Sequence, residues 1–165
     1  MIAVITPFND IDLDRVAQLI ARSNQFNLTT RRYSRADLAT LMQDSRCITR
    51  SIRLKDKFGD NGLIGVWIGR VEGEILDIDT WLMSCRVLGR GVEQHLLNHI
   101  IGYAREQDIS LIKGTYIPTS KNGLVREHYA KLGFTLVSGD AASGTHWELA
   151  IQQDTPLLTT YIQDA

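Results

Sequence analysis

The chain has 165 residues, of which 44% are hydrophobic and 22% charged, and its formal net charge is −1. This length and composition predict one ordinary globular domain with a hydrophobic core. The charge gives no general case for binding nucleic acid, and no apolar run is long enough to cross a membrane. Because no signal-peptide pattern is present, we expect a cytoplasmic protein in which Cys47 and Cys85 are free thiols.

The N-terminal part predicts a short strand and two helices. Residues 2–5 form a short apolar run. Asp12 is placed to cap a helix whose apolar side chains fall on one face. After the polar and basic connection 23–33, Ser34 and Asp37 have the spacing of a capping box, which predicts the start of a second, short helix.

The middle of the chain, residues 47–84, predicts a three-stranded antiparallel meander. Two clusters of turn-forming residues divide it, and its central run is apolar on both faces apart from glycines. The last run, 75–84, alternates as a half-buried strand does. Simple alternation would place Asp77 and Asp79 on one face of this strand together with Trp81.

The second half of the chain alternates between helices and strands. The elements that we predict there are a helix over 89–107, a strand over 110–116, a helix over 121–132, and strands over 134–137 and 146–151. Residues 154–165 have no clear assignment, so we expect a single domain, 1–153, followed by a tail. The whole order predicts a mixed α/β fold with a mostly antiparallel, twisted sheet of about six or seven strands and about four helices.

The segment Arg86-Val87-Leu88-Gly89-Arg90-Gly91, called the glycine turn below, joins the predicted strand 75–84 to the predicted helix 89–107. Its glycines allow the backbone to approach a ligand closely, and the first N–H groups of the helix have no partner within it. The helix dipole favours negative charge at the same place. The residues alone therefore predict a phosphate site, or else a tight connection without a ligand. Neither the Walker loop nor the dinucleotide fingerprint fits the spacing.

Two motifs resemble signatures of the GNAT acyltransferase superfamily. The glycine turn, 86–91, matches the acyl-CoA motif, while Asn122, Tyr129 and the pair 133–134 match a second motif on a later helix. The resemblance covers essentially the whole chain. It implies the GNAT fold, a splayed pair of parallel strands at the cofactor site, and CoA, acetyl-CoA or carrier-protein phosphopantetheine as the cofactor.

A narrower resemblance concerns residues 25–33, 58–62, 81–91 and 116–119, which are similar to the C-terminal GNAT-like domain of FkbH-like proteins. In that family, a phosphatase-like domain of the haloacid dehalogenase type usually precedes this domain. Together they load a glyceryl unit onto an acyl carrier protein for polyketide assembly. The resemblance implies an acyl carrier protein as a partner, and a phosphatase-like domain that this chain does not contain. Both a stand-alone relative and an excised domain are compatible with the sequence.

The GNAT resemblance also implies which residues bind the cofactor. They are Leu82, Met83, Ser84, Arg86, Leu88, Gly89, Arg90, Gly91, Val92 and Asn122. The glycine turn would hold the pyrophosphate of CoA, or the single phosphate of a carrier-protein arm. The backbone of the preceding strand would pair with the amides of the pantetheine arm, as an added strand would. Asn122 would bind the arm, or would instead cap its helix.

Three residues are candidates for catalysis. Tyr129 would be the general acid that protonates the leaving thiolate, or would simply pack on the inner face of its helix. Cys85 would accept the acyl group as a nucleophile, or would be a small buried residue. Asp79, with Asp77 beside it, would supply a general base on the strand, or would be solvated. We expect no metal site.

The sequence therefore predicts an acyltransferase that uses a CoA or carrier-protein thioester, in polyketide-type loading of a glyceryl or acyl unit. One alternative is an N-acetyltransferase that acts on a small amine or a peptide with acetyl-CoA. Another is a docking module that binds the arm of a carrier protein without turnover.

Overall fold

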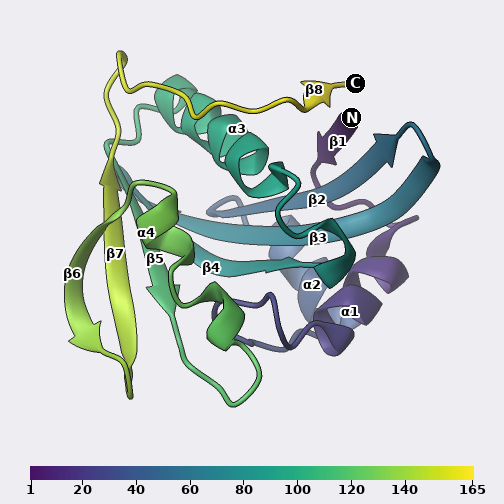
Figure 1. The fold of residues 1–165 in the computed structure, drawn as a ribbon, viewed down its shortest axis with the longest axis horizontal. Coiled ribbons are helices and arrows are strands. Elements are labelled where there is room, and N and C mark those ends of the chain that lie inside the picture. Colours follow the sequence, from purple (N-terminus) through teal and green to yellow (C-terminus); the bar gives the residue numbers. More distant parts are fainter.

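The structure is a computed structural model that describes all residues, 1–165. It is built on an eight-stranded sheet with the order β6-β7-β5-β4-β3-β2-β1-β8 (Figure 1). The strands are β1 (Ile2–Thr6), β2 (Cys47–Asp56), β3 (Gly59–Glu72), β4 (Ile75–Met83), β5 (Leu111–Tyr116), β6 (Thr135–Asp140), β7 (Gly144–Ala150) and β8 (Gln163–Asp164). The helices are α1 (Leu13–Arg22), α2 (Arg35–Gln43), α3 (Val92–Glu106) and α4 (His128–Lys131), with short 3₁₀ helices η1 (Cys85–Val87) and η2 (Gly123–Val125).

Two hydrophobic clusters lie on the two faces of the sheet. The larger one packs α3 and α4 against the sheet, and the smaller one packs α1 and α2 against the opposite face (Figure 1). The predicted mixed α/β architecture is confirmed, with one strand more than expected because β8 joins the edge of the sheet. No helix of the protein combines the length and the apolar composition needed to cross a membrane.

The two N-terminal helices begin in different ways. The predicted capping box of α2 is confirmed, because the Asp37 amide donates to Ser34 Oγ at 3.1 Å and the Ser34 amide donates to Asp37 Oδ2 at 2.9 Å. The predicted cap of α1 is wrong, because the Asp12 side chain makes no capping hydrogen bond. It instead binds the guanidinium of Arg53 on β2 at 2.5 Å, which ties the start of α1 to the sheet.

The predicted meander is confirmed as β2, β3 and β4, but β4 contains a bulge. Ile68 lies opposite Thr80 and Gly69 opposite Ile78, so that Asp79 has no partner on β3. Because a bulge shifts the alternation of side chains by one residue, Trp81 packs in the same cluster as Ile78. The prediction that Trp81 shares a face with Asp79 is therefore wrong.

Strands β4 and β5 pair in parallel over only part of their length. The pairing joins Ile75–Asp77 to Leu111–Lys113, and the remaining residues of β4 are not paired to β5. β5 continues along β7 as far as Tyr116. This is the splayed parallel pair that the resemblance implies, and it lies directly before the glycine turn.

Two predicted helices have different bounds in the structure. α3 begins at Val92 rather than at 89, because Gly89 and Gly91 have φ angles of 70° and 85°, which a right-handed helix cannot include. The predicted helix 121–132 is broken into η2 and the four-residue α4. The break lies at residues 126–127, where the Arg126 amide donates to the carbonyl of Gly123, three residues earlier, in the tighter 3₁₀ pattern.

The unassigned residues 154–165 form a strap along α3 that ends in β8, beside β1 (Figure 1). The side chain of Asn98 makes two hydrogen bonds to the backbone of Leu158, each of 2.8 Å. Its Nδ2 donates to the carbonyl group, and its Oδ1 accepts from the amide. Farther along, His95 Nε2 lies 2.9 Å from a carboxylate oxygen of Asp164. Ile162 is buried in the larger cluster, so the strap contributes to the core.

Candidate functional site

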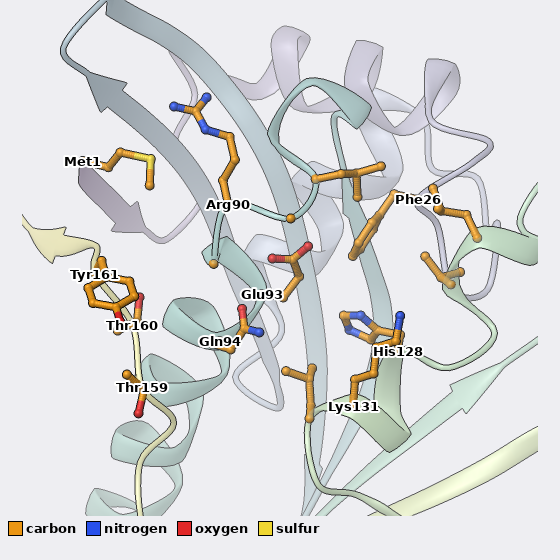
Figure 2. A pocket seen from close by; sticks show the side chains of 16 residues that line it. Met1, Phe26, Arg90, Glu93, Gln94, His128, Lys131, Thr159, Thr160 and Tyr161 are labelled. Atoms are coloured by element: carbon orange, nitrogen blue, oxygen red, sulfur yellow. The ribbon is translucent and has the colours of Figure 1, made fainter.

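A cavity of about 620 Å³ lies between the glycine turn and α4 (Figure 2). Residues of the turn and of the first turn of α3 form one wall, and residues of η2 and α4 form another. Phe26 and residues 159–161 of the strap complete the lining. Segments that are far apart in the sequence therefore meet around one space.

The glycine turn presents unpaired amides at this cavity. The N–H groups of Gly89, Gly91, Val92, Glu93 and Gln94 donate to no acceptor within the protein. The N–H groups of Leu88 and Arg90 are already engaged, by the carbonyl groups of Cys85 and Val87. Leu88 and Arg90 therefore offer no free N–H group in this structure, although both residues line the cavity. The remaining amides form a nest suited to an anion.

The two arginines of the turn do not point their charge into the cavity. Arg90 forms an ion pair with Asp56 on the β2–β3 hairpin, which lowers the pKa of that carboxyl group to about 2. Figure 2 shows its side chain directed away from the cavity. Arg86 does not line the cavity, and its Nε donates to Ser84 Oγ at 3.2 Å. Both guanidinium groups are thus engaged within the protein, and the predicted part of Arg86 and Arg90 in cofactor binding stays a prediction.

Side-chain charges at the cavity come from Glu93 and Lys131 instead. Glu93 lies on the first turn of α3 and Lys131 at the end of α4, and both line the cavity (Figure 2). Their charges are opposite. The backbone amides are therefore the main attraction for an anion at this site.

The edge of β4 that the pantetheine arm was expected to use is occupied by the chain itself. The Met83 amide donates to the Phe26 carbonyl, and the Leu28 amide donates to the Trp81 carbonyl, both at 3.1 Å. The hydroxyl of Thr29 donates to the carbonyl of Asp79, at 3.0 Å, on the same edge. Residues 26–29, called the inserted segment below, thus act as a short antiparallel strand in the splay.

The neighbouring backbone groups of this stretch are also engaged. Leu82 is paired with Val66 in β3, and the Ser84 amide donates to the Ile64 carbonyl at 2.8 Å. The predicted pairing of Leu82, Met83 and Ser84 with a pantetheine arm is therefore not available in this structure. Polar groups satisfied within the protein leave no free donors for a ligand.

Asn122 holds the inserted segment in place. Its Nδ2 donates to the carbonyl groups of Asn27 and Ile117 at 3.0 and 2.9 Å, and its Oδ1 accepts from the Thr119 amide at 2.7 Å. Its side chain is fully buried and does not cap η2. The Ile117 amide also donates to the Leu28 carbonyl at 2.8 Å. The predicted cap is wrong, since the side chain joins two loops, and the predicted binding of the arm stays a prediction.

Tyr129 is buried in an aromatic cluster behind the cavity. It is 1% exposed, and its hydroxyl has no hydrogen-bond partner. Burial raises its pKa well above the usual value. Its ring packs against Trp81 and Phe134, and a Cβ atom at Gly114 would lie 2.4 Å from it. Tyr129 does not line the cavity, so its role as a general acid stays a prediction.

The neighbouring His128 does line the cavity. Its ring meets Phe26 and Trp81 edge to face, with centroids 5.2 and 4.4 Å apart. Burial, with a smaller contribution from Lys131, lowers its pKa to about 3, so the imidazole is neutral at physiological pH. Its Nε2 atom has no hydrogen-bond partner.

Cys85 lies in a different cavity, of about 530 Å³, that shares no residue with the first. This second cavity is polar and is lined by Arg22, Gln25 and Lys121 among others. The thiol is exposed, and its sulfur lies 3.1 Å from Gln25 Oε1. The alternative of a small buried residue is therefore wrong, while the role as nucleophile stays a prediction.

The carboxylate of Asp79 is already surrounded by donors. It accepts from Arg31 at 2.5 Å, from the Tyr33 hydroxyl at 2.6 Å and from Thr80 Oγ1 at 2.8 Å. Burial and this carboxylate together raise the pKa of Tyr33 to about 12. Partial burial raises the pKa of Asp77 above its usual value. Asp79 thus serves to anchor the loop between α1 and α2, and its role as a base stays a prediction.

Sequence reasoning missed the inserted segment and the positions of Gln94 and His128 in the cavity wall. The apolar residues Phe26 and Leu28 alternate with polar neighbours, which is the pattern of a short strand and was a usable signal. Nothing local distinguishes Gln94 from other helix residues. Its importance depends on which wall of the cavity α3 supplies.

Comparison with known proteins supports the fold. No family model matches the sequence, and no curated protein matches it either. The ribosomal-protein-S18-alanine N-acetyltransferase from Escherichia coli superposes with a TM-score of 0.68 at 14% identity, over 96% of this chain and 99% of that chain. The PaiA N-acetyltransferase from Thermoplasma acidophilum, solved in complex with coenzyme A, gives 0.70 at 14% identity over 91% and 99%.

The GNAT domain of S. lividans PAT gives a TM-score of 0.68 at 16% identity, over 89% of each chain. Sequence identities this low establish a shared fold rather than a shared activity. The chain therefore has the fold of the GNAT acetyltransferases.

Proposed function

We propose that this protein transfers an acyl group from a phosphopantetheine thioester, carried by CoA or by an acyl carrier protein. The observation that carries the proposal is the nest of unpaired amides from Gly89 to Gln94 at the end of a cavity. A phosphate there would receive several N–H bonds and the favourable end of the α3 dipole. The PaiA N-acetyltransferase, which shares the fold, was solved with coenzyme A.

The charges around the cavity favour a ligand with a single phosphate. Arg90 is neutralised by Asp56, and Glu93 opposes Lys131. CoA carries a diphosphate and a further phosphate on its ribose, whereas the arm of a carrier protein carries one phosphodiester. We therefore favour a carrier protein as the donor or acceptor, in loading of a glyceryl or related acyl unit. A phosphatase-like enzyme of the haloacid dehalogenase type is the proposed partner.

The proposed reaction is an ordinary acyl transfer. A nucleophile on the acceptor attacks the thioester carbonyl, the carbon–sulfur bond breaks, and the thiolate takes up a proton. Tyr129 is the proposed proton donor, as its place in the second motif implies. Tyr129 lies behind the cavity-lining His128, whose ring it contacts, so the sulfur reaches its hydroxyl only if the lining rearranges.

A second candidate function is a docking module that binds the arm without turnover. Two observations favour it. The hydroxyl of the proposed proton donor is inaccessible, since Tyr129 is 1% exposed, and the inserted segment occupies the edge of β4. N-acetylation of an amine with acetyl-CoA is a third candidate. Two of the solved structures that share the fold are N-acetyltransferases, but here the carboxylate of Asp79 already accepts three hydrogen bonds.

The test uses the purified chain with acetyl-CoA, with an acyl carrier protein in its acylated and free forms, and with small amines. Transfer of acyl groups between carriers, followed by intact-protein mass spectrometry, supports the acyltransferase. Binding of the carrier protein with no transfer supports the docking module. Acetylated amine as the sole product supports the third candidate. An acyl adduct mapped to Cys85 would identify it as the nucleophile.

A further inference from the structure

Two side chains at the first cavity carry buried polar atoms with no partner. They are Gln94, through Oε1, and His128, through Nε2. Gln94 comes from the first turn of α3 and His128 from α4, and both lie around the same space, beyond the glycine turn (Figure 2). Buried polar atoms in proteins nearly always have a hydrogen-bond partner. Two exceptions on opposite walls of one cavity point to a ligand that supplies the missing partners.

The chemistry of the two side chains limits what that ligand is. The imidazole of His128 is neutral, so it offers one N–H donor and one acceptor nitrogen. The carboxamide of Gln94 offers a carbonyl acceptor and an NH₂ donor. Both are therefore matched to neutral groups that donate and accept together, as amides do. Leu88 and Val125 add apolar surface to the same lining.

A pantetheine arm has amide groups separated by short apolar links. The backbone edge of β4, which the GNAT resemblance implies as its partner, is not available in this structure. The edge of β4 is filled by the inserted segment, so backbone pairing with the arm is closed off. We propose that Gln94 and His128 are the arm-binding residues, which hold the amides of an arm whose phosphate lies at the glycine turn. This inference rests on the proposed function.

The test measures binding of pantetheine 4′-phosphate by calorimetry for the wild type, Gln94→Met and His128→Phe. Each substitution keeps the approximate size of the side chain and removes the groups that would hydrogen-bond to the arm. We expect each variant to bind about tenfold more weakly, since a lost hydrogen bond has an effect of this order. We expect thermal stability to be unchanged or higher, because a buried unpartnered atom is removed. A purely structural role would not move affinity and stability in opposite directions.

Two controls separate the arm from the phosphate and from general effects. Binding of inorganic phosphate, read from amide chemical shifts of the glycine turn, is expected to be the same in the wild type and in both variants. Gln107→Met makes the same change at the exposed far end of α3, and is expected to bind pantetheine 4′-phosphate as the wild type does. His128→Gln, which restores a donor and an acceptor, is expected to recover part of the affinity.

The outcomes are distinct. If the wild type binds pantetheine 4′-phosphate and both Gln94→Met and His128→Phe bind it with the same affinity, the inference is overturned and the proposed function stands. Failure of the wild type to bind pantetheine 4′-phosphate or CoA would overturn the proposed function, and the inference with it. If His128→Phe does not fold, Gln94→Met decides the result alone, because its side chain is only half-buried on the helix surface.

Discussion

The two cavities beside the end of β4 are similar in volume but share no lining residue, although some of the residues that line them are neighbours in the sequence. The larger one meets the glycine turn, with its unpaired amides and partly apolar walls. The smaller one meets Cys85 and is lined by Arg22 and Lys121. Gln25 lines the second cavity and the next residue, Phe26, lines the first, so the start of the inserted segment marks the boundary.

This difference shows that adjacency in sequence does not make a common site. A thiol directly before a phosphate-binding turn is an attractive nucleophile in sequence terms. In the structure, η1 and the inserted segment give the thiol of Cys85 and the amides of Gly89 and Gly91 different surroundings. Only the larger cavity meets the unpaired amides of the glycine turn, and only the smaller one meets the thiol of Cys85.

The strongest test of the larger cavity is Gly89→Asp. A carboxylate among the free amides would repel the phosphate, and a side chain at φ 70° would be strained. We expect binding of CoA and pantetheine 4′-phosphate to weaken by about a hundredfold or more, measured by calorimetry. Gly89→Asn is the matched control, because it has nearly the same shape without charge and tolerates the left-handed conformation. Equal losses in both variants would show that charge is not the cause.

The boundary between the cavities is tested by Asn122→Ala. The change removes the donors to Asn27 and Ile117 and leaves buried carbonyl groups unpaired. We expect the free energy of unfolding, from denaturant titration, to fall by about 2–4 kcal/mol. Asn61→Ala, which removes one hydrogen bond to Asp56 at the start of β3, should lower it by about 1 kcal/mol or less. A loss of similar size in both would mean that Asn122 does not secure the inserted segment.

The pH dependence of stability should report on the inner wall of the larger cavity. His128 has a folded pKa of about 3, below the value of 6.5 for an exposed histidine. The unfolded chain therefore binds a proton that the folded chain does not, and stability falls as pH decreases from 6.5 toward 3. Between pH 7 and pH 5, we expect the wild type to lose about 2 kcal/mol more than His128→Phe. Parallel curves from chemical denaturation would mean that His128 is not buried in neutral form.

A smaller effect is expected from Glu93→Gln, which removes the negative charge that faces the phosphate site. Affinity for pantetheine 4′-phosphate should rise by about threefold at low salt, and the gain should shrink as salt screens the charges. Glu106→Gln, at the other end of α3, is the control and should have no effect. A gain that does not depend on salt would argue against an electrostatic cause.

The smallest effect is predicted for Cys85→Ser. Because Cys85 lies outside the larger cavity, we expect acyl transfer to stay within about twofold of the wild type. The measurement is steady-state transfer between CoA and a carrier protein. A loss of more than tenfold with unchanged CoA affinity would make Cys85 the nucleophile, and would join the two cavities into one reaction path.

The features that the sequence predicted well depend on local patterns. The capping box at Ser34, the strands of the meander and the glycine turn each show a pattern among residues close in sequence. Alternation and turn-forming residues are therefore sufficient to find them. The second helix motif was harder to interpret, since the side chain of Asn122 joins two loops and its binding of a ligand stays a prediction. A motif fixes which residue is present, but its partners depend on the tertiary fold.

The features that the sequence did not predict depend on contacts between distant segments. The bulge at Asp79 depends on the register of β3 against β4, and the inserted segment depends on a free strand edge created by the divergence of β5. The strap is held by Asn98 and by pairing to β1. Apart from the alternation of Phe26 and Leu28 in the inserted segment, none of these has a local signal that competes with the loop-like composition of the segments involved.

The most direct test of the central claim is an amide chemical-shift titration of the wild-type chain with pantetheine 4′-phosphate. We predict the largest shifts at Gly89, Gly91 and Glu93, saturating at one equivalent, with little change at Gln25 or Cys85. Saturating shifts centred on Cys85 and Gln25, with the glycine turn unaffected, would contradict the account.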